Sequence, residues 1–469
     1  MILNIVLREI HQHVLSLRLH LVLVLLVVLF GLGTVSFINR YEADQERYRQ
    51  IHSAQLEKEG EWAARYLGYY MVQTRSQVLE PRANAFITDA GEKMMPFQFW
   101  FTGFGVEGFE VPNWASNDMM QAFRELNWVY IVSIIVGFTV LLFSYDLVSG
   151  DKENGTLALT VSYPVSRGVL LTGKYISVII VAMLVLLPGI VLSLIILLLS
   201  GTVVFDGMLL AETAGFLTGT ALFVACMAAL GLLASTVTSR SNVSLLLCLC
   251  IWLASVVVVP NSIVYFTGKL FPIESSRAIA DRIAQEMKAS SDRIAAAEAQ
   301  GGGVLTLTPI EHFRLYAKFN MQFKERELAI KETWNNSLLE QFRFSRRLTV
   351  LSPVCLFEQL IEAATGGGFV RLVRSWSDMK LFQSMLFDWY MELDAAASEE
   401  ETLHILDPYN PGHMLWKVVD LEEIPRFHEK QASAAERLAA ARLPLALLII
   451  YTAIAFALSF VLFLRYDVR

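Results

Sequence analysis

The sequence is poor in charge. Only 18% of its 469 residues are charged, against about 25% in an average soluble protein, while 55% are hydrophobic. The deficit arises from long uncharged apolar runs that alternate with charged stretches, which is typical of a membrane protein with soluble segments. The net charge of -7 argues against nucleic acid as a main partner.

Cysteine and histidine are also scarce. Three of the four cysteines, Cys226, Cys248 and Cys250, fall in apolar runs, and Cys355 has no obvious mate. This pattern predicts small buried hydrophobic residues and no disulfide framework. The eight histidines form no cluster with metal-ligand spacing. We therefore expect this chain to hold no metal and no cofactor.

Six apolar runs are long enough to cross a bilayer, which takes about 20 helical residues. They are Leu19–Ile38, Trp128–Leu147, Val169–Ser200, Thr213–Thr236, Val243–Tyr265 and Leu443–Leu464. A secretory signal peptide is the alternative for the first run. That run is longer than a usual signal core and no A-x-A-like cleavage site comes after it, so we interpret it as an uncleaved anchor.

The distribution of Lys and Arg predicts the orientation. The loop 201–212 has neither residue and carries Asp206 and Glu212, so it should face outward. If both termini are cytoplasmic, eight basic residues at the termini and in the short loops all fall on the cytoplasmic side: Arg8, Arg18, Lys152, Arg167, Lys174, Arg240, Arg465 and Arg469. We expect a multi-pass protein of the bacterial inner (plasma) membrane.

This topology divides the chain into five parts. They are residues 1–38 with the first helix, insertion 39–127, helices two to five over 128–265, insertion 266–442, and 443–469 with the last helix. Helical spacing in the second insertion predicts one mainly helical extracytoplasmic domain, built from both insertions. In the fourth helix, Gly215 and Gly219 form a G-x-x-x-G pattern that favours packing within the bundle, with a subunit interface as the alternative.

The cytoplasmic loop 145–174 carries the most informative pattern. After Glu153, Gly155 permits a sharp turn and Thr156 can cap the next segment. Pro164 then stops any preceding helix, and Arg167 leads into the third transmembrane run. We interpret the loop as a short amphipathic element that a partner can push, and an ordinary connection is the alternative.

The loop resembles that of ABC-2 type permeases. The residues that carry the resemblance are Glu153, Gly155, Thr156, Pro164, Val165, Ser166, Arg167, Gly173 and Lys174. The apolar run 157–163 is less rich in leucine than is common in that family. The two insertions resemble a subgroup that includes permeases linked to the maturation of multi-copper enzymes, although the insertions here lack Met/His clusters of the copper type.

The resemblance implies a mainly α fold, a six-helix transmembrane bundle of the ABC-2, type V exporter-like kind. It also implies cytoplasmic ABC ATPase subunits that contact Glu153, Gly155, Thr156, Pro164 and Arg167, and a second copy or a similar permease. The chain itself would not be an enzyme, with ATP and Mg²⁺ held by the ATPase. Gly168–Tyr175 matches G-x-x-x-x-G-K, but Tyr175 stands where a phosphate loop needs Ser or Thr, whose hydroxyl binds Mg²⁺.

Two functions remain open. One is export of an amphiphilic, lipid-like or peptide substrate. The other is mechanotransmission to a periplasmic or outer-membrane partner, with nothing crossing the membrane. A membrane enzyme or an ion-coupled transporter is disfavoured, because the central parts of helices three to six contain no Asp, Glu, Lys, Arg or His.

Overall fold

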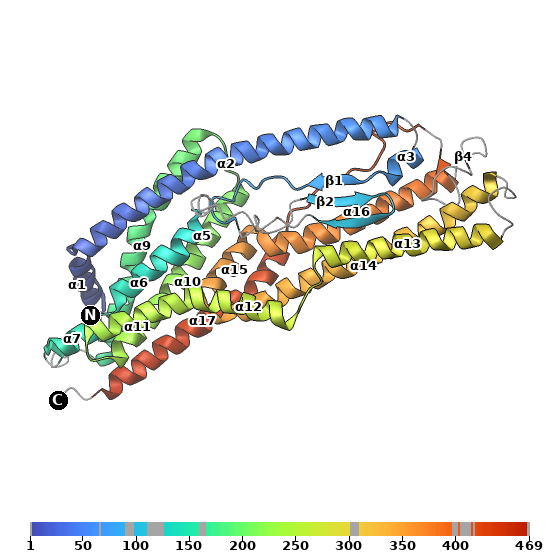
Figure 1. The fold of residues 1–469 in the computed structure, drawn as a ribbon. Helices are drawn as coiled ribbons and strands as arrows, with labels where there is room; N and C mark the ends of the chain where they lie inside the picture. The colour runs from blue at the N-terminus through green and yellow to red at the C-terminus, as the bar shows by residue number, and fades with distance from the viewer. Residues whose placement is uncertain are drawn as a thin grey trace.

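The fold was analysed in a computed structural model. It describes residues 2–64, 67–89, 98–109, 126–157, 159, 166–300, 309–395, 402–403, 414–415 and 418–466. The described chain is mainly α and elongated (Figure 1). A helical bundle forms one part, and both chain ends lie at its outer extremity, which we call the terminal end. A second part, the distal domain, extends from the opposite end of the bundle.

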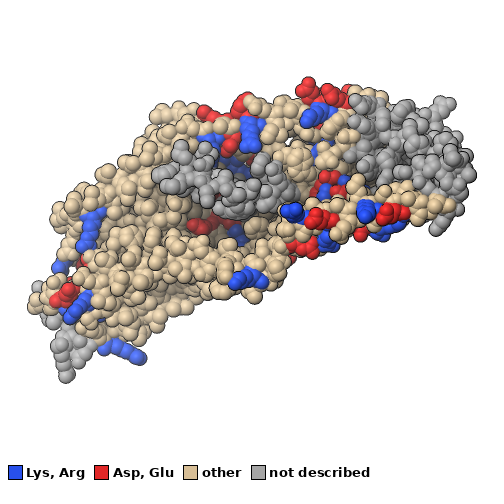
Figure 2. Space-filling model, viewed as in Figure 1, with Lys and Arg blue, Asp and Glu red and all other residues tan. Residues whose placement is uncertain are grey.

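Among the described residues, six helices are long and apolar enough to cross a membrane, as the sequence predicts. The candidate spans are Leu17–Ala63, Trp128–Glu153, Arg167–Ser200, Gly207–Val237, Ser241–Leu270 and Ala434–Arg465. They contain α2 (Leu17–Ala63), α5 (Trp128–Tyr130), η2 (Ile131–Val136), α6 (Gly137–Ser144), α7 (Ser149–Glu153), α9 (Arg167–Ser200), α10 (Gly207–Val237), α11 (Ser241–Leu253), η3 (Ala254–Val258), α12 (Val259–Leu270) and α17 (Ala434–Arg465). The bundle surface in Figure 2 is largely uncharged, as a lipid-facing surface requires.

A short helix that the sequence analysis did not anticipate, α1 (Ile2–Val14), precedes the first span. It packs against α9 at the terminal end, where Ile5 lies so close to Gly173 that a Cβ at that glycine would approach the Ile5 side chain to 2.8 Å. Its outer face exposes Leu3 and Leu7. An amphipathic helix in this position suits the boundary between lipid and water.

The first, second and third spans are joined by a buried polar contact. The hydroxyl groups of Thr34 on α2 and Ser193 on α9 lie 2.5 Å apart, and the indole of Trp128 donates to Ser193 Oγ at 2.9 Å. All three side chains are buried. Next to them, Gly189 allows Phe30 to approach α9 closely. Small and hydroxyl residues thus let these helices meet at short range, as is usual in bilayers.

The second insertion contributes a helix to the bundle. Helix α15 (Pro353–Thr365) packs between α10 and α17, and its apolar residues belong to the bundle core. Gly219 of α10 leaves room for α15, because a Cβ at this position would approach Ile361 Cδ1 to 2.6 Å. The G-x-x-x-G pattern therefore serves packing within the chain. The sequence analysis placed α15 in the external domain, because 13 residues are too few to register as a membrane span.

The distal domain combines both insertions. It contains the outer half of α2, with α3 (Leu67–Val72), α13 (Ser276–Gln300), α14 (Pro309–Leu348), η4 (Thr349–Leu351) and α16 (Gly368–Ala395). One core joins Phe99 and Phe101 of the first insertion to Trp376, Phe382 and Tyr390 of the second. Aromatic residues of both insertions therefore form much of this core.

This domain also holds a three-stranded antiparallel sheet that the sequence did not predict. Its strands are β1 (Arg75–Val78), β2 (Gln98–Thr102) and β3 (Gly105–Phe109), in the order β1-β2-β3. Phe99 and Phe101 point into the core while Trp100 points away, as strand alternation requires. A further pair, β4 (Thr402–Leu403) and β5 (Met414–Leu415), also lies in the second insertion.

An ionic cluster fixes α14 to β3. Lys324 Nζ lies 2.7 Å from Glu107 Oε1 and 3.2 Å from Glu327 Oε2. Lys331 lies 2.7 Å from Glu327 and 3.6 Å from Glu107. Burial alone would raise the pKa of Glu327, but its pairs with Lys331 and Lys324 outweigh burial and lower that pKa below 4.5. Burial alone would likewise lower the pKa of Lys324, but Glu107 and Glu327 raise it.

This cluster predicts acid sensitivity of the distal domain. Because the native pKa of Glu327 is lowered, its stabilisation is present above pH 4.5 and is lost as the pH falls through the native value. Between about pH 5 and pH 3, the unfolding temperature should therefore fall more for the wild type than for Glu327→Gln, which has no carboxylate to protonate. Equal acid sensitivity of the two proteins, measured by thermal unfolding in lipid nanodiscs, would contradict this assignment.

Candidate functional site

The residues that the sequence makes prominent lie around the short helix α7 at the terminal end of the bundle (Figure 1). Helix α7 ends the second span, and the chain then turns at Gly155 toward α9. Only five residues long, α7 has no side-chain cap of its own at its first residue. Its stability must therefore come from contacts with neighbouring helices.

Two adjacent side chains of α7 hold the two ends of the turn between α10 and α11. Lys152 Nζ donates to the carbonyl oxygens of Thr236 and Thr238, at 2.6 and 3.1 Å. Glu153 Oε2 accepts a hydrogen bond from the Ser241 N–H at 2.8 Å. A cation thus lies at the carboxyl end of α10 and an anion at the amino end of α11. Both signs match the helix dipoles.

The start of α7 is held by α10 as well. The buried Ser235 Oγ accepts hydrogen bonds from the N–H groups of Val148 and Ser149, at 2.9 and 3.0 Å. These donors precede the first helical hydrogen bond of α7 and would otherwise lack a helical partner. Helix α10 therefore contacts both ends of α7.

Lys174 of α9 forms the buried centre of this region. Its Nζ lies 2.9 Å from Asp151 Oδ2, 3.6 Å from Glu9 Oε1 and 2.8 Å from the Leu147 carbonyl oxygen. The Lys174 and Glu9 side chains are about 10% exposed. One cation thus connects α9 to α7 and to α1. We call Ser149, Asp151, Lys152, Glu153, Arg167 and Lys174 the α7 hub.

Arg167 extends the α7 hub to the last span. Its guanidinium donates to the carbonyl oxygens of Leu464 and Tyr466, at 3.2 and 2.8 Å, where α17 ends. The first span is attached nearby through the ion pair of Arg18 with Asp146, at 3.3 Å. Every candidate span therefore has an end fixed within this region.

Glu153 and Arg167 each bind a helix end of this chain, Glu153 at the start of α11 and Arg167 at the end of α17. Thr156 is exposed, and its hydroxyl donates to Asp151 Oδ1 at 3.2 Å. Gly155 is exposed with φ +68, and in the described part of the chain no atom beyond its neighbours lies within 4 Å of where its Cβ would be. Pro164 lies outside the described residues.

The sequence analysis gave no individual role to Asp151, Lys152 or Lys174. The sequence marks these three residues only as charged residues beside an apolar span. Lys174 is also one of the residues that carry the family resemblance. The phosphate-loop pattern at Gly168–Tyr175 has a packing explanation. These residues lie inside α9, Gly168 faces Phe460 of α17, and Lys174 is held by two carboxylates.

The buried charges predict a strong dependence on Lys174. In Lys174→Met, the partly buried carboxylates of Glu9 and Asp151, 12% and 26% exposed, lose their cation, which should cost about 3 kcal/mol. Thermal unfolding in lipid nanodiscs should show a clear loss. A triple variant that adds Glu9→Gln and Asp151→Asn should recover much of it, and Lys288→Met, on an exposed face of α13, serves as the control. An unchanged Lys174→Met protein would show that these charges do not hold the region together.

The chain was also compared with known proteins. A family model described as ABC-2 family transporter protein matches residues 3–468. A search of curated proteins finds no match. Members of this family are membrane components of ABC transporters, generally not catalytic themselves, and they work with ABC ATPase subunits. Because the match covers nearly all of the sequence and the structure has six apolar spans, this chain belongs to the ABC-2 family of transporter proteins.

Proposed function

We propose that this chain is the permease of an ATP-driven exporter and that separate ATPase subunits push on the α7 hub. The observation that carries the proposal is the set of bonds from this small region to helix ends. Lys152 and Glu153 hold α10 and α11, Lys174 holds α9, and Arg167 holds α17. A displacement of α7 would therefore act on several spans at once.

The proposed orientation places the terminal end in the cytoplasm and the distal domain outside. Support comes from the cations that gather at the terminal end, including Arg18, Lys152, Arg167 and Lys174. The positive-inside rule assigns such an end to the cytoplasm. ATP and Mg²⁺ would then be held by the ATPase subunits on this side.

The proposed substrate is amphiphilic, lipid-like or a peptide. The fifth span, made of α11, η3 and α12, exposes apolar side chains along its length: Leu246, Leu249, Leu253, Val257, Val258 and Val264. This surface suits lipid, a second copy of the chain, a similar permease, or the apolar part of a substrate that moves between two copies. The central parts of spans three to six contain no charged side chain that would bind a small ion.

Gly155 provides the test of ATPase coupling. Proline cannot adopt its φ of +68, whereas asparagine tolerates this region better than most residues. Gly155→Pro should reduce the ATPase that co-purifies with the permease by about tenfold, and Gly155→Asn should retain most of it. Gly155 is exposed, and a Cβ there would meet no atom of the described residues, so neither change should reduce folding of the bundle in the membrane, although Gly155→Pro also loses the N–H that donates to the Lys152 carbonyl oxygen. Full assembly and ATP-dependent activity of Gly155→Pro would refute the proposed docking surface.

Thiol labelling tests the orientation. In a variant without the exposed Cys250, a cysteine at Lys288 on α13 should react with an impermeant reagent added outside. A cysteine at Asn154, beside α7, should react only after the membrane is opened. Both positions are exposed, so accessibility differs only through the membrane. The reverse pattern would refute the proposed topology.

A second candidate function is mechanotransmission to a partner outside. It is favoured by α2, a single helix of 47 residues and thus about 70 Å, which runs from the terminal end of the bundle into the distal core at Ala63. Such a helix can carry a displacement beyond the bilayer without any substrate crossing. Vesicles that contain the complex distinguish the two functions, because an exporter moves substrate as it hydrolyses ATP and a mechanotransmitter does not.

A further inference from the structure

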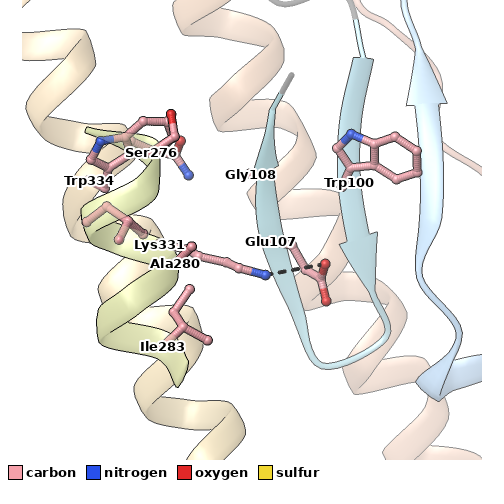
Figure 3. Close-up of a pocket in the computed structure, with 10 residues that line it drawn as sticks. Trp100, Glu107, Gly108, Ser276, Ala280, Ile283, Lys331 and Trp334 are labelled. Carbon is pink, nitrogen blue, oxygen red and sulfur yellow. Dashed lines mark ion pairs between the residues drawn. The ribbon is translucent and has the colours of Figure 1, made fainter. Parts of the chain in front are cut away.

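A pocket of about 250 Å³ lies in the distal domain between the β2–β3 hairpin and the helices α13 and α14 (Figure 3). It is far from the α7 hub and is not part of the proposed coupling site. β3 is the outer strand of its sheet, and Glu107 and Gly108 of this strand border the pocket.

The pocket walls are apolar and aromatic. Trp100 points away from the distal core and is 37% exposed, a large value for an indole with buried strand neighbours. On the opposite side, Trp334 is held in place because its Nε1 donates to the Glu274 carbonyl oxygen at 2.9 Å. Ile279 and Ile283 of α13 complete the apolar lining. Such walls favour a bulky apolar group.

Asn335 adds an unpaired amide to this lining. Its side chain is only 1% exposed, and among the residues that the structure describes neither Oδ1 nor Nδ2 has a hydrogen-bond partner. It faces Gly108, where a Cβ would approach Nδ2 to 3.1 Å. Leaving a buried amide unpaired costs about 1–3 kcal/mol. A group that supplies one donor and one acceptor would remove that cost, and a peptide bond supplies both.

The charges at the pocket argue against an ionic ligand. Lys331 and Glu107 both line it, and Figure 3 shows the ion pair between them. Lys331 is also paired with Glu327, and Glu107 with Lys324. These two cations and two anions balance one another, so a phosphate or carboxylate would have to displace an existing partner. A hydrocarbon chain, for its part, would leave Asn335 unpaired.

We propose that this pocket binds a peptide segment of a protein partner, which inserts one bulky apolar side chain between Trp100 and Trp334 and pairs a backbone amide with Asn335. The size of the pocket suits one aromatic or large aliphatic side chain. The proposal does not depend on whether the chain exports a substrate or transmits force, because both functions leave the distal domain open to a partner.

The test uses the full-length protein in lipid nanodiscs and the blocked peptide acetyl-Gly-Phe-Gly-amide. Saturation-transfer NMR should detect saturable binding, and the corresponding Ala peptide should bind about tenfold more weakly. Asn335→Leu should weaken binding of the Phe peptide about tenfold without lowering the unfolding temperature, because it removes an unpaired polar group. Asn336→Leu, at the exposed neighbouring position, is the matched control and should bind as the wild type does.

A second variant fills the space. Ile283→Trp should also abolish binding, and it decides the matter if Asn335→Leu does not fold. Equal binding of the Phe peptide by wild type, Asn335→Leu and Ile283→Trp would overturn the proposal, as would no binding by the wild type. If 1-hexanol binds as tightly as the Phe peptide and is unaffected by Asn335→Leu, the pocket takes a hydrocarbon chain and the proposal is also wrong.

Discussion

A backbone carbonyl or N–H that loses its helical partner inside a bilayer must find another partner, and the bundle depends on how this is done. At the π-helical segment η2, the Ile134 carbonyl oxygen, which also accepts from the Gly137 N–H, accepts a hydrogen bond from Trp252 Nε1 at 3.1 Å. At the second one, η3, the Ser255 carbonyl oxygen accepts from Ser352 Oγ at 2.6 Å. In both places, a side chain from a neighbouring segment donates a hydrogen bond to a carbonyl oxygen of the π-helical segment. The irregular backbone thus provides a polar contact between neighbouring elements.

The same constraint explains the α7 hub. Helix ends leave unpaired groups, and here they are bound by charged side chains of α7 and by Arg167 at the start of α9. The same contacts therefore cap the helix ends and join neighbouring helices to one another. At the other end of the bundle, Arg437 of α17 pairs with Glu212 of α10 at 2.7 Å and bonds to the Ala364 carbonyl oxygen of α15. Both ends of the apolar bundle are thus closed by ionic contacts.

The six spans could be predicted from the sequence, because long apolar runs are local signals. The sheet could not, since β1 and β2 are four and five residues long and their pairing is not local. Helix α15 was misplaced because its apolar face is short and its burial depends on the fit of Ile361 against Gly219.

For the candidate site, the loop and Glu153, Gly155 and Arg167 could be singled out from the sequence, but their partners could not. That Arg167 binds the end of α17, about 300 positions later in the chain, is a property of the folded bundle. The positive φ of Gly155 was foreseeable from the residue type alone. The role of Lys174 was not, because a lysine at the edge of an apolar run is usually solvated.

The two π-helical segments also determine how the side chains before and after them are rotated about the axis of each span. Each residue of a regular α-helix turns the side chains by about 100°, and a π turn takes up extra residues without breaking the helix. Before η2, the Trp128 indole binds Ser193 of the third span. After η2, the Phe138 ring packs against Trp252 of the fifth span in a tilted geometry, with ring centroids 5.3 Å apart. The second span therefore presents one aromatic residue to each of two different neighbours. An uninterrupted α-helix of the same sequence would place these two rings at a different relative rotation and would match at most one of them.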